Sequence, residues 1–86
     1  MYEVILAPAA IRAYARAELA LARKLKRCFV NLSEEPHIHP CITRLTGTHK
    51  GRWRYRVGDW RVVYSVDETS RQVHVVIIAH RREVYR

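Results

Sequence analysis

The chain of 86 residues is long enough for one small domain with a single hydrophobic core. Its hydrophobic fraction of 49% and charged fraction of 28% are typical of a globular chain and exclude a disordered one. Lysine and arginine number 16 against 8 acidic residues, so the net charge of +8 favours a polyanionic partner, either a nucleic acid or an acidic protein.

The first residues, MYEVILAPAAI, contain a short apolar run at Glu3–Leu6 that ends before Pro8 and predicts a first strand. This start lacks the basic leader and cleavage-like spacer of a signal peptide, and no apolar stretch approaches the length that spans a membrane. We therefore expect a cytoplasmic protein without a membrane partner. In that compartment Cys28 and Cys41 should be reduced thiols rather than a disulfide.

The segment from Pro8 to Pro36 is rich in alanine, leucine, arginine and lysine, which are strong helix formers. It is too long for one packed helix in so small a domain, so we expect two antiparallel helices with a break near residues 17 to 19. Pro36 should close the second helix. The apolar positions recur at roughly helical spacing and predict the packed face; they are Ile11, Tyr14, Leu21, Leu25, Cys28, Phe29 and Leu32.

Like-charged residues four apart mark the exposed sides of these helices, as Arg12 with Arg16 and Arg23 with Arg27. Such pairs are usually solvated. They could also contact a nucleic acid or a protein partner.

Residues 37–51, HIHPCITRLTGTHKG, form a predicted connector because Pro40, Gly47 and Gly51 interrupt them. His37, His39 and Cys41 alternate within it, but a zinc site usually needs two well-spaced pairs of ligands. We interpret the histidines as loop residues and expect no metal and no cofactor.

Three runs with strand character follow the connector, at residues 52–57, 60–66 and 72–79. Gly58 and Asp59 link the first two and predict a tight hairpin turn with glycine in its first position. The order predicts an α+β fold, in which an N-terminal strand and a two-helix hairpin precede a three-strand meander. The helices should pack on an antiparallel sheet, and residues 1–86 should form a single domain.

The hairpin sequence GRWRYRVGDW alternates arginines with large apolar residues, and successive side chains of a strand point to opposite faces of the sheet. A two-residue turn at Gly58 and Asp59 sets the register of the two strands. One face should then pack against the helices through Trp53, Tyr55, Val57, Trp60, Val62 and Tyr64. The other face collects Arg52, Arg54, Arg56 and Arg61.

In this register Arg56 lies directly opposite Arg61, which costs something under ~1 kcal/mol for an exposed pair of like charges. Several arginines on one face make sense if a phosphate binds among them, since each guanidinium can donate two hydrogen bonds to it. The alternative is a solvated surface whose charges discourage aggregation.

Three segments in order carry a family resemblance: RLTG at residues 44–47, GRWRYRVGDWRVVYSVD at 51–67 and HRREVYR at 80–86. Together they resemble the RelE/ParE superfamily of bacterial and archaeal toxins along the whole chain. The resemblance implies two helices on an antiparallel sheet, as in small microbial ribonucleases, and a cognate acidic antitoxin. Members of the RelE branch cut messenger RNA in the ribosomal A site without a metal, by attack of the ribose 2′-OH on the adjacent phosphate.

Carried over by motif position, the RelE branch implies catalytic roles for Arg54, Arg56, Arg61, Arg81 and Tyr85. Further contacts to nucleic acid are expected from Arg52, His80 and Arg82. Arginines suit the role of stabilising negative charge on the phosphoryl oxygens during cleavage.

The best-known members carry lysines where Arg54 and Arg56 stand, and arginine is a poor general base because it stays charged. The base is therefore Tyr85 or His80, although His80 could equally be a capping residue. We predict a ribosome-dependent messenger RNA endoribonuclease. The alternatives are a ParE-like inhibitor of DNA gyrase, a branch that typically lacks the C-terminal arginine and tyrosine, and an inactive homologue that binds antitoxin.

Overall fold

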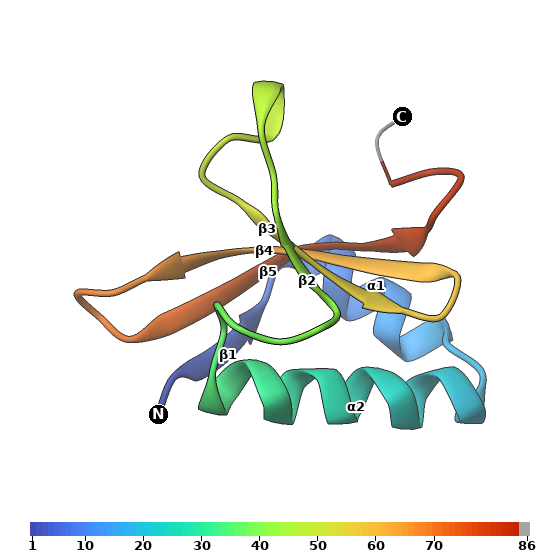
Figure 1. Ribbon diagram of the computed structural model, residues 1–86. Helices are drawn as coiled ribbons and strands as arrows, with labels where there is room; N and C mark the ends of the chain where they lie inside the picture. The colour runs from blue at the N-terminus through green and yellow to red at the C-terminus, as the bar shows by residue number, and fades with distance from the viewer. Residues whose placement is uncertain (85–86) are drawn as a thin grey trace.

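Two helices cover one face of a five-stranded sheet in the computed structural model, which describes residues 1–84 (Figure 1). The elements in chain order are β1 Glu3–Leu6, α1 Pro8–Arg16, α2 Leu19–Glu34, β2 Ile42–Arg44, a 3-10 helix Gly47–His49, β3 Trp53–Val57, β4 Trp60–Asp67 and β5 Gln72–His80. The strands are arranged in the order β1-β5-β4-β3-β2. The predicted α+β fold, with helices packed on a sheet and a C-terminal meander, is confirmed.

The sheet differs from the prediction in two details. It is mixed rather than wholly antiparallel, because β1 pairs in parallel with β5. Strands joined by a short turn must run antiparallel, but no short turn joins β1 to β5, so the sequence left their relative direction open. The predicted connector also contains β2, whose three residues pair with β3 and are too few to show a strand period.

The helices form where the composition predicts them, and the break falls at Ala17 and Glu18. Helix α1 packs on β5, whereas α2 packs across β1 and β3. The buried face of α2 consists of Leu21, Leu25, Cys28 and Leu32. The prediction was wrong for Ile11, which is 54% exposed because it lies on the outer side of α1. Neither helix within residues 1–84 is long and apolar enough to span a membrane.

The predicted hairpin is confirmed pair by pair, from Trp53 opposite Tyr64 to Val57 opposite Trp60. Gly58 has a φ of +58° while Asp59 keeps a negative φ, the combination of a type II′ turn, whose twist matches that of the strands. The four inner positions, Tyr55, Val57, Val62 and Tyr64, are buried in the core. The two tryptophans lie half-buried at its margins.

The deepest hydroxyl of the core belongs to Tyr64, which donates a hydrogen bond of 2.7 Å to the carbonyl oxygen of Pro36. Burial raises the pKa of Tyr64, so the hydroxyl stays protonated and can keep donating. This bond fixes the chain just after α2 to the middle of β4.

The two cysteines are free, and they differ in exposure, which gives a simple chemical test. Burial raises the pKa of the Cys28 thiol, so it stays protonated, whereas Cys41 is partly exposed. At about pH 8 we expect iodoacetamide to modify Cys41 but not Cys28 in the folded protein, as read by intact mass. Denaturant should expose both thiols. Equal modification of both in the native state would contradict the packing of Cys28.

Candidate functional site

The face of the sheet away from the helices carries the predicted row of arginines. Because Tyr55 and Val57 point into the core, Arg54 and Arg56 point to the outer face. Arg61 on β4 lies directly opposite Arg56, as predicted, and Arg52 precedes β3 in the same alternation. The Gly47–His49 turn and the C-terminal segment both rise on this side, so they flank the arginine row (Figure 1). We call the surface formed by Arg52, Arg54, Arg56 and Arg61 the arginine face.

Arg61 is held in place by the hairpin turn. Its Nη1 atom donates to the carbonyl oxygens of Gly58, at 2.8 Å, and of Trp60, at 2.9 Å. These bonds use the two hydrogens of Nη1 and leave the N–H groups of Nη2 and Nε, which form a second fork on the guanidinium. An anchored guanidinium loses little further side-chain freedom when that fork binds an anion.

Arg81 approaches the same turn from the other end of the chain. Trp60 pairs with His80, the last residue of β5, so the chain leaves the sheet beside the turn. The backbone N–H of Arg81 donates to the carbonyl oxygen of Asp59 at 2.8 Å, and its Nε lies 3.9 Å from Asp59 Oδ1. Arg61 and Arg81 therefore both contact the hairpin turn, Arg61 through Gly58 and Arg81 through Asp59.

His80 does not lie on the arginine face, and its predicted contact with nucleic acid stays a prediction. Its ring meets that of Trp60 edge to face, with centroids 5.8 Å apart, and so lies on the side of the helices. Its Nδ1 accepts the backbone N–H of Arg82 at 3.3 Å. His80 caps the turn that follows β5, one of the alternatives that the sequence left open. Arg82 itself is exposed.

The outer face has an apolar centre that the sequence did not single out. Val63 lies opposite Arg54 and is fully buried, although no helix covers this side of the sheet. Val84 in the C-terminal segment is also buried, and neither valine belongs to the core beneath the helices. We infer that residues 81–84 fold over the outer face at this patch. Tyr85, the remaining predicted catalytic residue, lies outside the described residues.

The histidines of the connector are engaged in structural contacts. His37 lies between two carboxylates, with Nδ1 3.2 Å from Glu35 Oε1 and Nε2 2.8 Å from Glu68 Oε1. The backbone N–H of His37 donates to Glu35 and lowers the pKa of that carboxyl. His39 stacks on Tyr55, with ring centroids 5.1 Å apart. In the described part of the chain, no three histidine, cysteine or acidic side chains gather closely enough to hold a metal ion.

Comparison with known families decides the chain's identity. The family model described as the ParE toxin of the type II toxin–antitoxin system parDE matches residues 4–85. The chain belongs to this toxin family. The predicted membership of the RelE/ParE superfamily is thereby confirmed. No curated protein sequence matches the toxin.

Solved structures show the same fold. The archaeal RelE–RelB complex from Pyrococcus horikoshii OT3 contains a chain that is 25% identical to the toxin, with a TM-score of 0.81 and coverage of 96% of the toxin and 98% of that chain. A chain of the RelBE2 complex from Mycobacterium tuberculosis is 24% identical, with a TM-score of 0.78 and coverage of 92% of the toxin and 96% of that chain. The YoeB/ParE toxin from Agrobacterium tumefaciens is 18% identical, with a TM-score of 0.82 and coverage of 91% of the toxin and 96% of that chain.

The predicted site residues of the toxin therefore fall into three groups. Arg54, Arg56 and Arg61 share the arginine face, with Arg52 at its end. Arg81 reaches the edge of that face through the turn at Asp59, with Arg82 next to it. His80 points the other way. The apolar patch of Val63 and Val84 was missed because a lone valine among arginines carries no distinctive signal.

Proposed function

We propose that the toxin is a ribosome-dependent endoribonuclease that acts in the cytoplasm, cleaves messenger RNA in the A site and thereby inhibits translation. One observation carries this proposal: Arg61 and Arg81 both contact the hairpin turn, at the edge of a face that bears three further arginines. A phosphodiester bound there would face guanidinium groups from three separate segments of the chain.

The chemistry that suits this site is attack of a ribose 2′-OH on the adjacent phosphate. The new bond joins the 2′-oxygen to phosphorus, the bond from phosphorus to the 5′-oxygen breaks, and the proton lost by the 2′-OH is balanced by one gained by the 5′-oxygen. Negative charge grows on the phosphoryl oxygens in between, and the free fork of Arg61 with the Arg81 guanidinium would stabilise it.

Proton transfer is the role that the arginines fill poorly, since they stay charged. His80 is turned towards the helices, which leaves Tyr85 as the proposed proton carrier or orienting group. With no strong base among the residues of the arginine face, alignment of the 2′-OH by the ribosome would supply much of the rate. Free RNA should therefore be cut poorly.

A second candidate function is inhibition of DNA gyrase, as in the ParE branch. The family model that matches residues 4–85 is that of ParE, which favours this candidate. The C-terminal HRREVYR, with its arginine and tyrosine, favours the ribonuclease instead. The two functions predict different targets and are separable in one experiment.

A purified translation reaction with a defined message, run beside a gyrase supercoiling assay, tests the proposal. We expect the toxin to cut the message only when ribosomes are present and to leave supercoiling unchanged, with primer extension locating the cut. Blocked supercoiling with an intact message would assign the toxin to gyrase. Neither effect would indicate an inactive homologue.

We also propose an acidic antitoxin as the toxin's partner. The Pyrococcus horikoshii and Mycobacterium tuberculosis relatives were solved as toxin–antitoxin complexes. A net charge of +8 would steer an acidic partner towards this chain and make the association weaken with added salt.

A further inference from the structure

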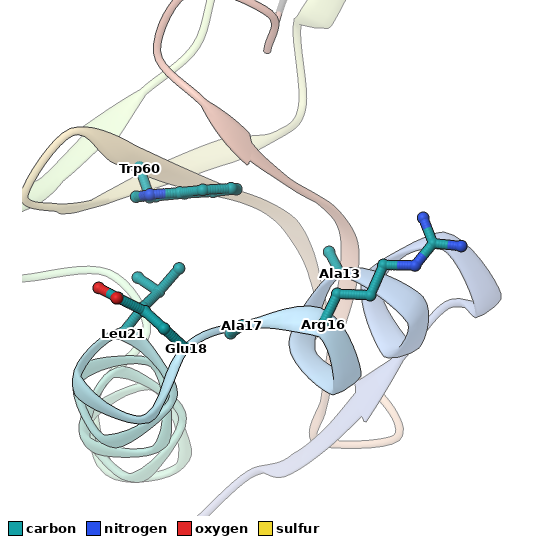
Figure 2. A pocket seen from close by; sticks show the side chains of 6 residues that line it. All are labelled: Ala13, Arg16, Ala17, Glu18, Leu21 and Trp60. Atoms are coloured by element: carbon teal, nitrogen blue, oxygen red, sulfur yellow. The ribbon is translucent and has the colours of Figure 1, made fainter.

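A hollow lies on the helix side of the sheet, between Trp60 and the link that joins α1 to α2. Its volume is about 350 Å³, and its lining residues are Ala13, Arg16, Ala17, Glu18, Leu21 and Trp60. Figure 2 shows the Trp60 indole across from the helix link, with the Leu21 side chain pointing towards it and Arg16 extending outward. The space exists because Ala13 and Ala17 present only methyl groups to it.

A smaller hollow of about 170 Å³ continues from the first. The two share Glu18, Leu21 and Trp60, and the second extends along α2 to Lys24 and along the sheet to the hairpin turn and His80. We call the combined depression the Trp60 trough. It runs from α1 to the end of β5, and the sheet separates it from the arginine face.

The trough combines an apolar floor with a charged rim, where Arg16 and Lys24 lie with Glu18 and Asp59. Trp60 is half-buried, and Leu19, beside the rim residue Glu18, is 66% exposed. Arg16 and Lys24 are exposed at the rim, and neither forms an ion pair within residues 1–84. Tryptophan and arginine around a pocket are the residues that dominate binding energy at protein interfaces. Glu18 and Asp59 balance these two cations at the rim itself, whereas the helical segment beside it, residues 8–34, carries six cations against two acids.

We propose that the Trp60 trough is the docking site for a segment of the antitoxin that inserts a branched aliphatic side chain beside Trp60 and sets a carboxylate against Arg16. This proposal rests on the proposed antitoxin partner. A second copy of the toxin would bring a further net charge of +8 to a chain that already carries +8, so charge favours an acidic occupant.

A segment seated in the trough would leave the arginine face uncovered, yet it would touch the start of the C-terminal segment that carries Arg81. The occupant contacts the Trp60 ring, whose edge meets His80, and His80 begins the turn that carries Arg81. The antitoxin would thus hold the toxin from the side opposite the substrate.

Two changes and one matched control test the docking site, with the product of the reading frame beside the toxin gene as the probe. Arg16→Glu reverses the rim charge and Ala13→Leu fills the hollow, so each should weaken binding by about tenfold or more in titration calorimetry. Arg12→Glu makes the same charge change one turn earlier on α1, outside the trough, and should change binding by less than about threefold. All three variants should remain as toxic as the parent when expressed alone, and an unchanged thermal midpoint verifies their fold.

A spectroscopic measurement reports on the trough directly. Trp53→Phe leaves Trp60 as the single tryptophan of the two in the chain, and bound antitoxin should shield its fluorescence from acrylamide. If the parent toxin binds the probe and both trough variants bind it equally well, the docking site is wrong but the antitoxin partner stands. Parent toxin that fails to bind would refute the partner and the docking site together. A dimer of the toxin that Ala13→Leu disrupts would give the trough to a second copy instead.

Discussion

Replacing Arg61 or Arg81 with alanine should lower messenger cleavage by roughly 10²–10³-fold, the usual cost of removing one charge contact to a transition state. Both guanidinium groups lie at the hairpin turn, where a phosphate on the arginine face would meet them. Neither residue belongs to the core, so the domain should stay folded. Ribosome-bound messenger cleaved per minute is the measurement, followed by growth of cells that express each variant.

Arg27→Ala is the matched control, because it removes the same charge from the exposed side of α2. Its cleavage rate should stay close to that of the parent. Arg61→Lys keeps the charge but loses the second fork of the guanidinium, so it should recover only part of the activity. If alanine at Arg61, Arg81 and Tyr85 leaves the toxin fully active in each case, the ribonuclease proposal fails and gyrase becomes the target to pursue.

The hairpin shows what the sequence alone can determine. A strand period of two residues and a two-residue turn fix every cross-strand pair, so the opposition of Arg56 and Arg61 follows directly from the order of the residues. The packed face of α2 follows similarly from its spacing of apolar residues. Where the pattern of a segment agrees with its long-range packing, a short pattern is enough to predict which residues pair and which are buried.

Placements that depend on contacts between distant segments are not fixed by the local sequence. The register of β4 with β5 decides on which face of the sheet His80 lies. This register contains an irregularity after Val63 that no residue in the sequence marks. The convergence of Arg81 with Arg61 follows from the same register. Ile11 fits the helical spacing, but α1 is short and packs on β5 through other residues, so this side chain stays exposed.

The family resemblance adds membership and fold, but it does not choose between ribosome and gyrase. The matching family model is that of ParE, whereas RelE and YoeB toxins share the fold at 14–25% identity. In our proposal the target depends on a few side chains at the hairpin turn and the chain end, and so few residues contribute little to a match over residues 4–85.

Shortening Leu25 to alanine should lower the free energy of unfolding by about 2–5 kcal/mol, since it opens a cavity between α2 and the sheet. Leu25 is completely buried at the centre of the packed face of α2. Small domains have only about 5–15 kcal/mol of stability in total, so the thermal midpoint should fall by roughly 10 °C or more.

Val30→Ala on the same helix is the control for Leu25→Ala, because Val30 is 49% exposed and its loss should change stability by no more than about 0.5 kcal/mol. Equal shifts for the two variants in urea or thermal unfolding would contradict the docking of α2 through Leu25. The Leu25→Ala and Val30→Ala variants also serve as stability references for the test of the arginine face. Toxicity lost at Arg61 or Arg81 with no fall in the midpoint, against the fall seen for Leu25→Ala, assigns that loss to the chemistry of the site rather than to unfolding.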